Sequence, residues 1–309
     1  MSTATLYQVE TADQANSLKV TEIARPVGDW NQYASLSTAT VGNRVYLLGF
    51  KAATGVLDVY EFTVAAPWAK VTGAIQVGAE KDIVNTFTLG NHAHIAVYKA
   101  KNGIFEIYAL GDDLSLSAPL QYYRNHEPAI TKNFTTVKFF TNFGQVVMLG
   151  YDTVSGYVAS YTLGMIATSP SGVPPIAVTP AWSHMWAPGW TRFAFVQFGG
   201  ANFFLKTNTA KPNVNIDHMN DVLNMGTVEV GSKLNLPDAQ ALNNVEPFLL
   251  GAGDPYFVTY LKAAGQVVLY RFRSDCMGWI AVGKVTSQIN AGLVTPVRVP
   301  DGKVFLLVG

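Results

Sequence analysis

The chain has few charged residues and a single cysteine. Of its 309 residues, 14% are Asp, Glu, Lys or Arg, against about 25% in an average soluble domain. Basic and acidic residues number 21 each, so the formal net charge is zero. This balance argues against a nucleic-acid-binding protein, which needs clustered positive charge. The lone Cys276 excludes an intrachain disulfide and a cysteine-based zinc cluster.

Long apolar runs are also missing. No stretch approaches the roughly 18 consecutive apolar residues of a membrane-spanning helix. Residues 1–20 have neither the basic start nor the apolar segment of a secretory signal. We therefore expect a soluble protein without a membrane span, cytoplasmic unless a signal peptide has been removed.

A repeat runs through the sequence. An apolar strand, a glycine-containing turn and an aromatic strand recur, with the turn glycines at Gly55, Gly103, Gly156 and Gly265. The 210 residues from Gly55 to Gly265 cover four periods of about 52 residues, so 309 residues hold about six units. Residues of alternating polarity, as in 56–62, indicate that each unit consists of β-strands.

Each unit has room for four strands. A further strand precedes each hairpin, and a fourth is predicted at 67–74 and 278–285. Four strands in a repeat of this length are typical of a propeller blade. The sequence therefore predicts an all-β chain, folded over residues 1–309 as a single six-bladed β-propeller with four-stranded blades.

The two ends of the chain share the last unit. The sequence stops after a second strand at 303–309, and segments 3–10 and 17–24 can supply the missing outer strands. We expect residues 1–24 to complete a blade with 295–309, which closes the ring and leaves no open sheet edge. Two β-sandwiches are the alternative fold, but they would not explain a repeat split across the termini.

Loops that cross from one blade to the next gather on one face of a propeller, and binding residues are expected there. These loops are predicted at 25–36, 78–85, 124–136, 181–192, 238–246 and 286–295. The residues predicted to bind substrate lie in them or just beyond: Trp30, Tyr33, Asn85, Asn133, Trp186, Trp190, Asn243, Glu246 and Arg298.

Four residues in these loops are candidates for catalysis. A histidine or lysine can move a proton, and an arginine can stabilise a developing oxyanion. The candidates are Arg192, His184, Lys132 and His126. Ordinary solvation at the surface or in the channel is the alternative for each.

Tryptophan is concentrated in one segment. Three of the six tryptophans lie in 182–190, beside His184 and Arg192. Exposed there, they would form a stacking platform for a sugar or aromatic ring. Packing between blades is the alternative, and we expect it of Trp68 and Trp279.

Metal and nucleotide motifs are weak. His92 and His94 point to the same face of a strand and could begin a metal pair, but no third ligand is evident nearby. HExxH, GxSxG and a phosphate-binding glycine loop at a strand-to-helix junction are missing. No metal and no cofactor are predicted.

Equivalent blade positions carry different residues. Ser37, Asn85, Phe139 and Ala194 each lie five residues before a turn glycine. Equivalent sugar sites would need the same hydrogen-bonding residues in every blade. The diversity favours one asymmetric site near the propeller axis.

Residues 188–219 resemble one repeat of the tachylectin-type propellers. They contain Gly-Trp-Thr at 189–191, an apolar strand, Gly199-Gly200, a second apolar strand and Ile216-Asp217. This resemblance implies carbohydrate binding. Trp190 has no counterpart before the other inner strands, so equivalent sugar sites do not follow. In low charge and abundant aromatics the chain is also similar to cofactor-free cyclases of fungal natural-product pathways, including hetero-Diels–Alderases.

Two functions follow from these observations. The leading hypothesis is an enzyme that binds a largely apolar small molecule at the central channel and promotes its cyclisation or rearrangement without a cofactor. Trp186 and Trp190 would be the walls, and Arg192, His184 or Lys132 would polarise an oxygen. The alternative is a lectin-like carbohydrate-binding propeller without catalysis, and a protein-binding scaffold is a third class.

Overall fold

The computed structural model describes most of the chain: residues 4–12, 17–26, 28–63, 68–71, 74–79, 81–123, 130, 133–142, 144–166, 175–198, 201–208, 213–219, 228–234, 242–251, 253–272, 279–286 and 293–309. The chain divides into two compact units. Unit 1 comprises residues 1–32 and 189–309, and unit 2 comprises residues 33–188. Three sheets lie in each unit.

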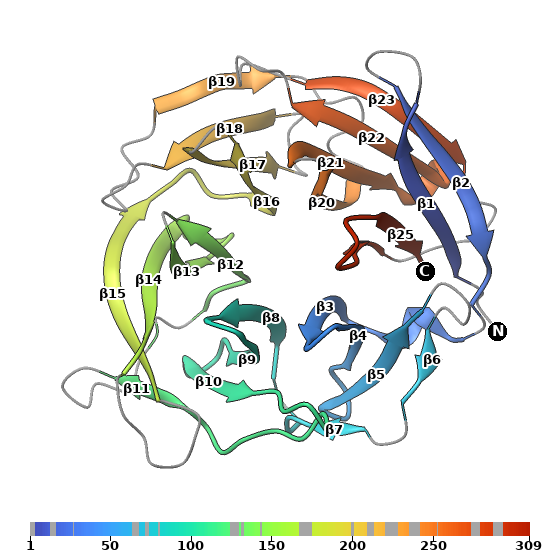
Figure 1. The fold of residues 1–309 in the computed structure, drawn as a ribbon. Helices are drawn as coiled ribbons and strands as arrows, with labels where there is room; N and C mark the ends of the chain where they lie inside the picture. The colour runs from blue at the N-terminus through green and yellow to red at the C-terminus, as the bar shows by residue number, and fades with distance from the viewer. Residues whose placement is uncertain are drawn as a thin grey trace. The chain divides into compact units, whose positions relative to one another are not determined.

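The sheets of unit 2 are formed by strands that follow one another in the chain (Figure 1). The first contains β3 (Ser35–Val41), β4 (Arg44–Lys51), β5 (Val56–Phe62) and β6 (Ala69–Lys70), with β7 (Ile75–Gln76) also paired to β5. The second contains β8 (Ile83–Leu89), β9 (His92–Lys99) and β10 (Ile104–Ala109). The third contains β12 (Thr136–Asn142), β13 (Gln145–Tyr151), β14 (Tyr157–Met165) and β15 (Ile176–Met185), with β11 (Gln121–Tyr123) added in parallel to β15.

Unit 1 repeats the pattern and contains both termini. Its first sheet is β16 (Trp190–Phe198), β17 (Ala201–Asn208), β18 (Asn213–Met219) and β19 (Val228–Leu234). The second is β20 (Leu242–Leu250), β21 (Asp254–Leu261), β22 (Gln266–Phe272) and β23 (Trp279–Thr286). The third is β24 (Val294–Arg298), β25 (Val304–Val308), β1 (Thr5–Thr11) and β2 (Leu18–Ala24). Two 3-10 helices, Trp30–Gln32 and Lys262–Ala264, also belong to this unit.

These six sheets, antiparallel apart from the added β11, confirm the predicted all-β, six-bladed β-propeller. The predicted closure is confirmed as well, because β1 pairs with β25 from Thr5 opposite Val308 to Val9 opposite Val304. The two ends of the chain lie together at this sheet (Figure 1). That residues 1–309 form a single domain remains a prediction.

The blade of β8, β9 and β10 is completed in an unexpected way. Its predicted repeat calls for a fourth strand, but β11 pairs in parallel with β15 of the next blade. The Gln121 side chain takes the place of a strand on the edge of β10, because its amide accepts from Ile107 N and donates to Phe105 O, each at 3.0 Å. Leu120 N adds a bond of 2.8 Å to Ile107 O. The edge of β10 is therefore hydrogen-bonded without a regular strand.

The three blades of unit 2 share one packing arrangement before their inner strands. Tyr33, Lys81 and Phe134 occupy equivalent places, since the residue after each donates its backbone N–H to the second strand: Ala34 to Phe50, Asp82 to Tyr98 and Thr135 to Tyr151. The side-chain contacts of these three residues differ in kind. Tyr33 donates to Asp58 Oδ2 at 2.8 Å, Lys81 pairs with Glu106, and the ring of Phe134 covers Gly150, which lies opposite Ala159.

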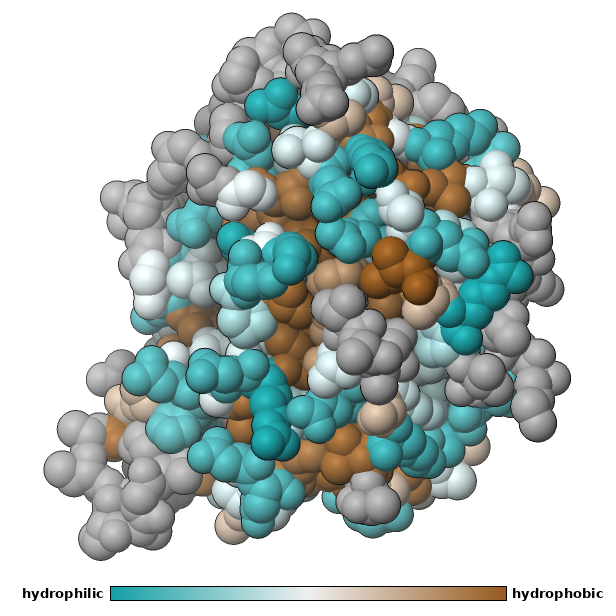
Figure 2. Space-filling model, turned by 45° about the vertical axis from the view of Figure 1, so that its right-hand side comes forward, coloured by the Kyte–Doolittle hydropathy of each residue, from teal (hydrophilic) through white to brown (hydrophobic). Residues whose placement is uncertain are grey.

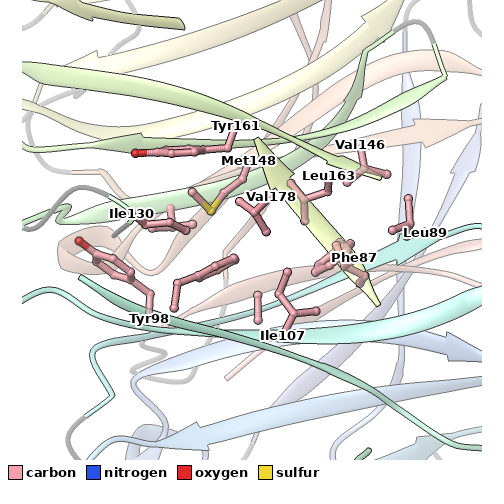
Figure 3. Close-up of a cluster of buried hydrophobic side chains, with 14 of the residues drawn as sticks. Phe87, Leu89, Tyr98, Ile107, Ile130, Val146, Met148, Tyr161, Leu163 and Val178 are labelled. Atoms are coloured by element: carbon pink, nitrogen blue, oxygen red, sulfur yellow. The ribbon is translucent and has the colours of Figure 1, made fainter. Parts of the chain in front are cut away.

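The apolar core lies between neighbouring sheets. In unit 2, Phe87, Tyr98 and Ile107 from one blade pack against Met148 and Leu163 from the next (Figure 3). Similar apolar clusters fill the space between neighbouring sheets of unit 1. Figure 2 shows that hydrophilic side chains cover much of one face of the molecule, with apolar side chains showing between them.

Candidate functional site

Two of the predicted site residues lie on neighbouring inner strands of unit 1. Arg192 is on β16 and Glu246 is on β20, and these two strands pack side by side. Both residues were expected in or beside crossing loops. The strands begin earlier than predicted, at Trp190 and Leu242, so a sheet holds both side chains in place.

The Arg192 guanidinium is partly buried. Burial lowers the pKa of this group from its usual value, and the negative charge of Glu246 opposes that change. Nη1 of Arg192 donates to the carbonyl oxygen of Thr191 at 2.9 Å. The group keeps its positive charge at any ordinary pH, so the site presents a fixed cation beside a carboxylate.

Asn244 adds a polar group that the sequence analysis missed. Its Nδ2 donates to Glu246 Oε1 at 3.2 Å. Its Oδ1 is buried and has no hydrogen-bond partner among the described residues. Thr207 lies opposite Arg192 in the pairing of β16 with β17. Its buried hydroxyl also has no hydrogen-bond partner among the described residues. Buried acceptors without donors are costly, so this part of unit 1 suits a ligand or water that brings hydroxyl groups.

Strand alternation explains why Asn244 lies beside Glu246, while the role predicted for Asn243 remains a prediction. Residues two apart on a strand share a face, and Asn244 bonds to Glu246. Asn243 lies at an irregularity in the pairing of β20 with β21, and its side chain is outside the described part of the chain. Period two in 242–250 was the signal that could have identified Asn244.

The tryptophans predicted as walls are buried. Trp190 is 6% exposed, and its ring lies 4.9 Å from Lys206 Nζ, which in turn pairs with Asp217 at 2.8 Å. Trp186 is 8% exposed and packs on Tyr151 in unit 2. The exposed platform expected of these two residues is wrong, because both rings fill the packed interior. A binding role for them remains a prediction.

Trp30 and Tyr33 are also packed. Trp30 lies against Gly28 and Gly309 in unit 1. Tyr33 hydrogen-bonds to Asp58 and Tyr60 in unit 2. These contacts give both residues a structural role, and substrate binding by them remains a prediction.

The other predicted residues lie on other elements or outside the described part of the chain. In unit 2, Asn85 Nδ2 donates to Val137 O at 3.0 Å, and Asn133 is exposed with φ 69°. Also in unit 2, His184 is exposed on β15, in a segment predicted as a loop that is strand as far as Met185. In unit 1, Arg298 is exposed on β24. Lys132 and His126 lie outside the described residues.

His92 and His94 do not behave as a pair. Both are on β9, but His92 is exposed and His94 is 2% exposed, stacked on Phe87 at 5.2 Å. No group of three His, Cys, Asp or Glu residues that could hold a metal occurs in the described part of the chain. Within the same residues, no helix has the length and apolar character needed to cross a membrane.

Solved structures share the fold at low sequence identity. A candidate 6-phosphogluconolactonase from Bacteroides fragilis is 15% identical, with a TM-score of 0.56 over 98% of this chain and 87% of that one. A functionally unknown protein from Desulfotomaculum acetoxidans is 11% identical, with a TM-score of 0.53 over 96% and 93%. An exo-β-1,3-galactanase from Phanerochaete chrysosporium is 10% identical, with a TM-score of 0.52 over 88% and 66%. No protein-family model and no curated protein matches the sequence.

Proposed function

We propose that the protein binds a small hydroxylated molecule that carries an acidic group, such as a sugar acid, at Arg192, Asn244 and Glu246. The observation that carries the proposal is the buried Asn244 Oδ1, which has no hydrogen-bond partner among the described residues, on a side chain that bonds to Glu246, whose charge acts on the partly buried Arg192. Arg192 would bind the acidic group of the ligand. Asn244 Oδ1 and the Glu246 carboxylate would accept hydrogen bonds from its hydroxyls.

The fold gives this proposal further support. Two of the structures that share it carry names of carbohydrate-related enzymes, a candidate 6-phosphogluconolactonase and an exo-β-1,3-galactanase. A small polar ligand also fits the residues on β16 and β20 better than the largely apolar substrate expected from the sequence. The hypothesis of cofactor-free cyclisation needs Trp186 and Trp190 as walls of an open site, but both rings are packed in the core.

Thermal shift with a ligand panel tests the proposal. The panel contains gluconate, galacturonate, glucose and an apolar bicyclic hydrocarbon of similar size. A ligand that binds only the folded state raises Tm with its concentration. We expect the sugar acids to raise Tm more than glucose, and the hydrocarbon to have no effect.

A matched pair of arginine substitutions locates the binding site. Arg192→Gln removes a charge-assisted contact worth about 1.5–3 kcal/mol, so affinity for the acid should fall at least about tenfold. Arg271→Gln is the control, because Arg271 forms an exposed pair with Asp254 at 3.6 Å in the same unit. Equal affinity in the two variants, or a Tm rise with the hydrocarbon alone, would overturn the proposal.

A further inference from the structure

The outer strand of one blade in unit 2 has an exposed aromatic end. The first half of β15 is buried at Ile176 and Val178. From Pro180 to Met185 its residues are exposed or half-buried, and Met185 is 57% exposed. Trp182 and His184 lie in this exposed half, with ring centroids 5.7 Å apart. Trp182 is half-buried and His184 is exposed, so this aromatic pair is partly accessible to a ligand.

Trp182 packs on residues that are themselves held in place by packing and hydrogen bonds. Trp182 contacts Trp186 with centroids 6.4 Å apart, and Trp186 contacts Tyr151 at 5.8 Å. Trp186 N donates to Gly156 O at 2.8 Å, and Gly156 has φ 81° with no room for a Cβ beside Trp186 O. Tyr151 OH donates to Ala187 O at 2.8 Å. Trp182 is therefore presented by packed neighbours and loses little freedom when a ligand binds.

The two strands that carry this pair are neutral. No Asp, Glu, Lys or Arg occurs between Asp152 and Arg192, a span that contains all of β14 and β15. These two strands offer no charge to an acidic or basic partner. They offer aromatic faces together with the hydrogen-bonding nitrogens of His184, which is exposed.

We infer that Trp182 and His184 form a surface site for a neutral glycan, distinct from the site at Arg192. A pyranose ring has an apolar face that can lie on Trp182 and hydroxyls that can bond to His184. The edge of β15 could instead receive a peptide strand, but Pro180 in this half of the strand has no N–H for such a pairing. The neutral aromatic surface favours the sugar.

Affinity electrophoresis of the full chain tests the site. Native gels are cast with soluble β-1,3-glucan, β-1,3-galactan or xylan, and migration is compared with a gel that lacks polysaccharide. We expect at least one of these neutral polysaccharides to retard the protein. Trp182→Ala should weaken the apparent affinity at least about tenfold, and Trp182→Phe, which keeps a ring on Trp186, should weaken it by less.

A second variant and two controls keep the result interpretable if Trp182→Ala fails to fold. His184→Ala changes an exposed side chain and should weaken retardation a few fold, whereas His92→Ala, also exposed in unit 2, should not change it. Ile104→Ala removes another exposed apolar side chain, 41% exposed, and should be without effect. Folded Trp182→Ala should keep the Tm rise with gluconate, which separates this site from the one at Arg192.

Three outcomes overturn the inference. The first is that none of the polysaccharides retards the wild-type chain. The second is that His184→Ala and Trp182→Phe migrate as the wild type does in every gel. The third is that Trp182→Ala converts a dimer into a monomer by sedimentation while polysaccharide has no effect, which would make this surface a contact between two copies of the chain.

Discussion

At the scale of single residues, burial decides what a polar side chain does in this protein. His94 was a candidate metal ligand in the sequence, but the structure stacks it on Phe87 in the core of unit 2. Burial lowers the pKa of His94 to about 4, because the charged imidazolium is poorly solvated there. The nearby charge of His92 acts in the same direction. His94 is therefore a neutral core residue at physiological pH.

The lowered pKa of His94 makes the free energy of unfolding fall as the pH is lowered. Unfolded His94 titrates near its ordinary value of about 6.5, so the unfolded chain binds more protons than the folded chain between pH 6.5 and 4. The contribution of His94 is complete above pH 6.5 and is lost as the pH falls through that range. By pH 4.5 the loss amounts to about 2 kcal/mol.

Urea unfolding at pH 7 and pH 4.5 measures this effect. His94→Phe keeps the ring stacking and removes the titration, so it should lose about 2 kcal/mol less than the wild type over this interval. His92→Gln, at an exposed position on the same strand, should keep most of the wild-type difference, because burial is the largest cause of the lowered pKa of His94. If His94→Phe shows the same loss as the wild type, His94 is not the buried neutral group described here.

Residue type and chain position indicated charged candidates, but the sequence did not show which aromatic rings are packed. Arg192 and Glu246 lie on neighbouring strands of unit 1, where the charge of Glu246 acts on Arg192, and their binding role remains a prediction. Trp186 and Trp190 were expected at the surface, because a Pro-Gly segment with several tryptophans does not reveal which ring faces the core. Composition carries no information about that direction.

At the scale of strands and blades, the blades of unit 2 fill the same position before the inner strand with different residue pairs. In the first blade Tyr33 donates to a buried Asp58, which also pairs with Lys51 at 2.7 Å and Lys70 at 3.1 Å. The third blade has Phe134 and Ala159 at the corresponding places. In both blades the ring covers a glycine of the second strand, Gly49 or Gly150. In each blade the two residues of the pair are complementary: a hydroxyl and a carboxylate in the first blade, and an apolar ring and a small apolar side chain in the third.

A double substitution tests this equivalence. Asp58→Ala removes the buried carboxylate that accepts from Tyr33 and pairs with Lys51 and Lys70, and should cost about 2 kcal/mol in the free energy of unfolding. Tyr33→Phe with Asp58→Ala reproduces the pair of the third blade and should be more stable than Asp58→Ala alone. Urea unfolding measures both values, with Glu61→Ala as the control, because Glu61 pairs with an exposed Arg44 at 3.7 Å. A double variant less stable than Asp58→Ala would show that the two blades are not equivalent.

Strand prediction worked because alternation and turn glycines are local signals. Gly55, Gly103, Gly156 and Gly265 all have positive φ at the turns where the repeat placed them. The outer strands were harder to predict, since fewer neighbours constrain them. β6 is two residues long where a longer strand was expected, and Gln121 replaces a strand beside β10 through its side chain. Side-chain mimicry of a strand leaves no periodic pattern in the sequence.

At the scale of the whole molecule, the last blade depends on both ends of the chain. β25 at the C-terminus lies between β24 and the N-terminal β1, and Val304 to Val308 are buried. Removing β1 and β2 would expose the edge of β25 and its apolar side chains. An exposed apolar strand edge promotes association with other chains.

Truncation measures this dependence. A chain that begins at Arg25 should lose its cooperative unfolding transition and form oligomers, while a chain that begins at Ala4 should behave like the full protein. Calorimetry and light scattering after size-exclusion chromatography report the two properties. A monomeric, cooperatively folded chain from Arg25 onward would contradict the role given to the N-terminal strands.

The repeat makes the blades alike, yet the residues proposed to bind a ligand occur once. Arg192, Asn244 and Glu246 belong to β16 and β20, and equivalent positions in other blades hold other residues, such as Asn85 and Phe139. A single small-molecule site per chain is thus the central claim. Calorimetric titration with the sugar acid that raises Tm most gives the number directly. The account predicts one site per chain, weakened at least about tenfold in Arg192→Gln, and several equivalent sites that survive this substitution unchanged would contradict it.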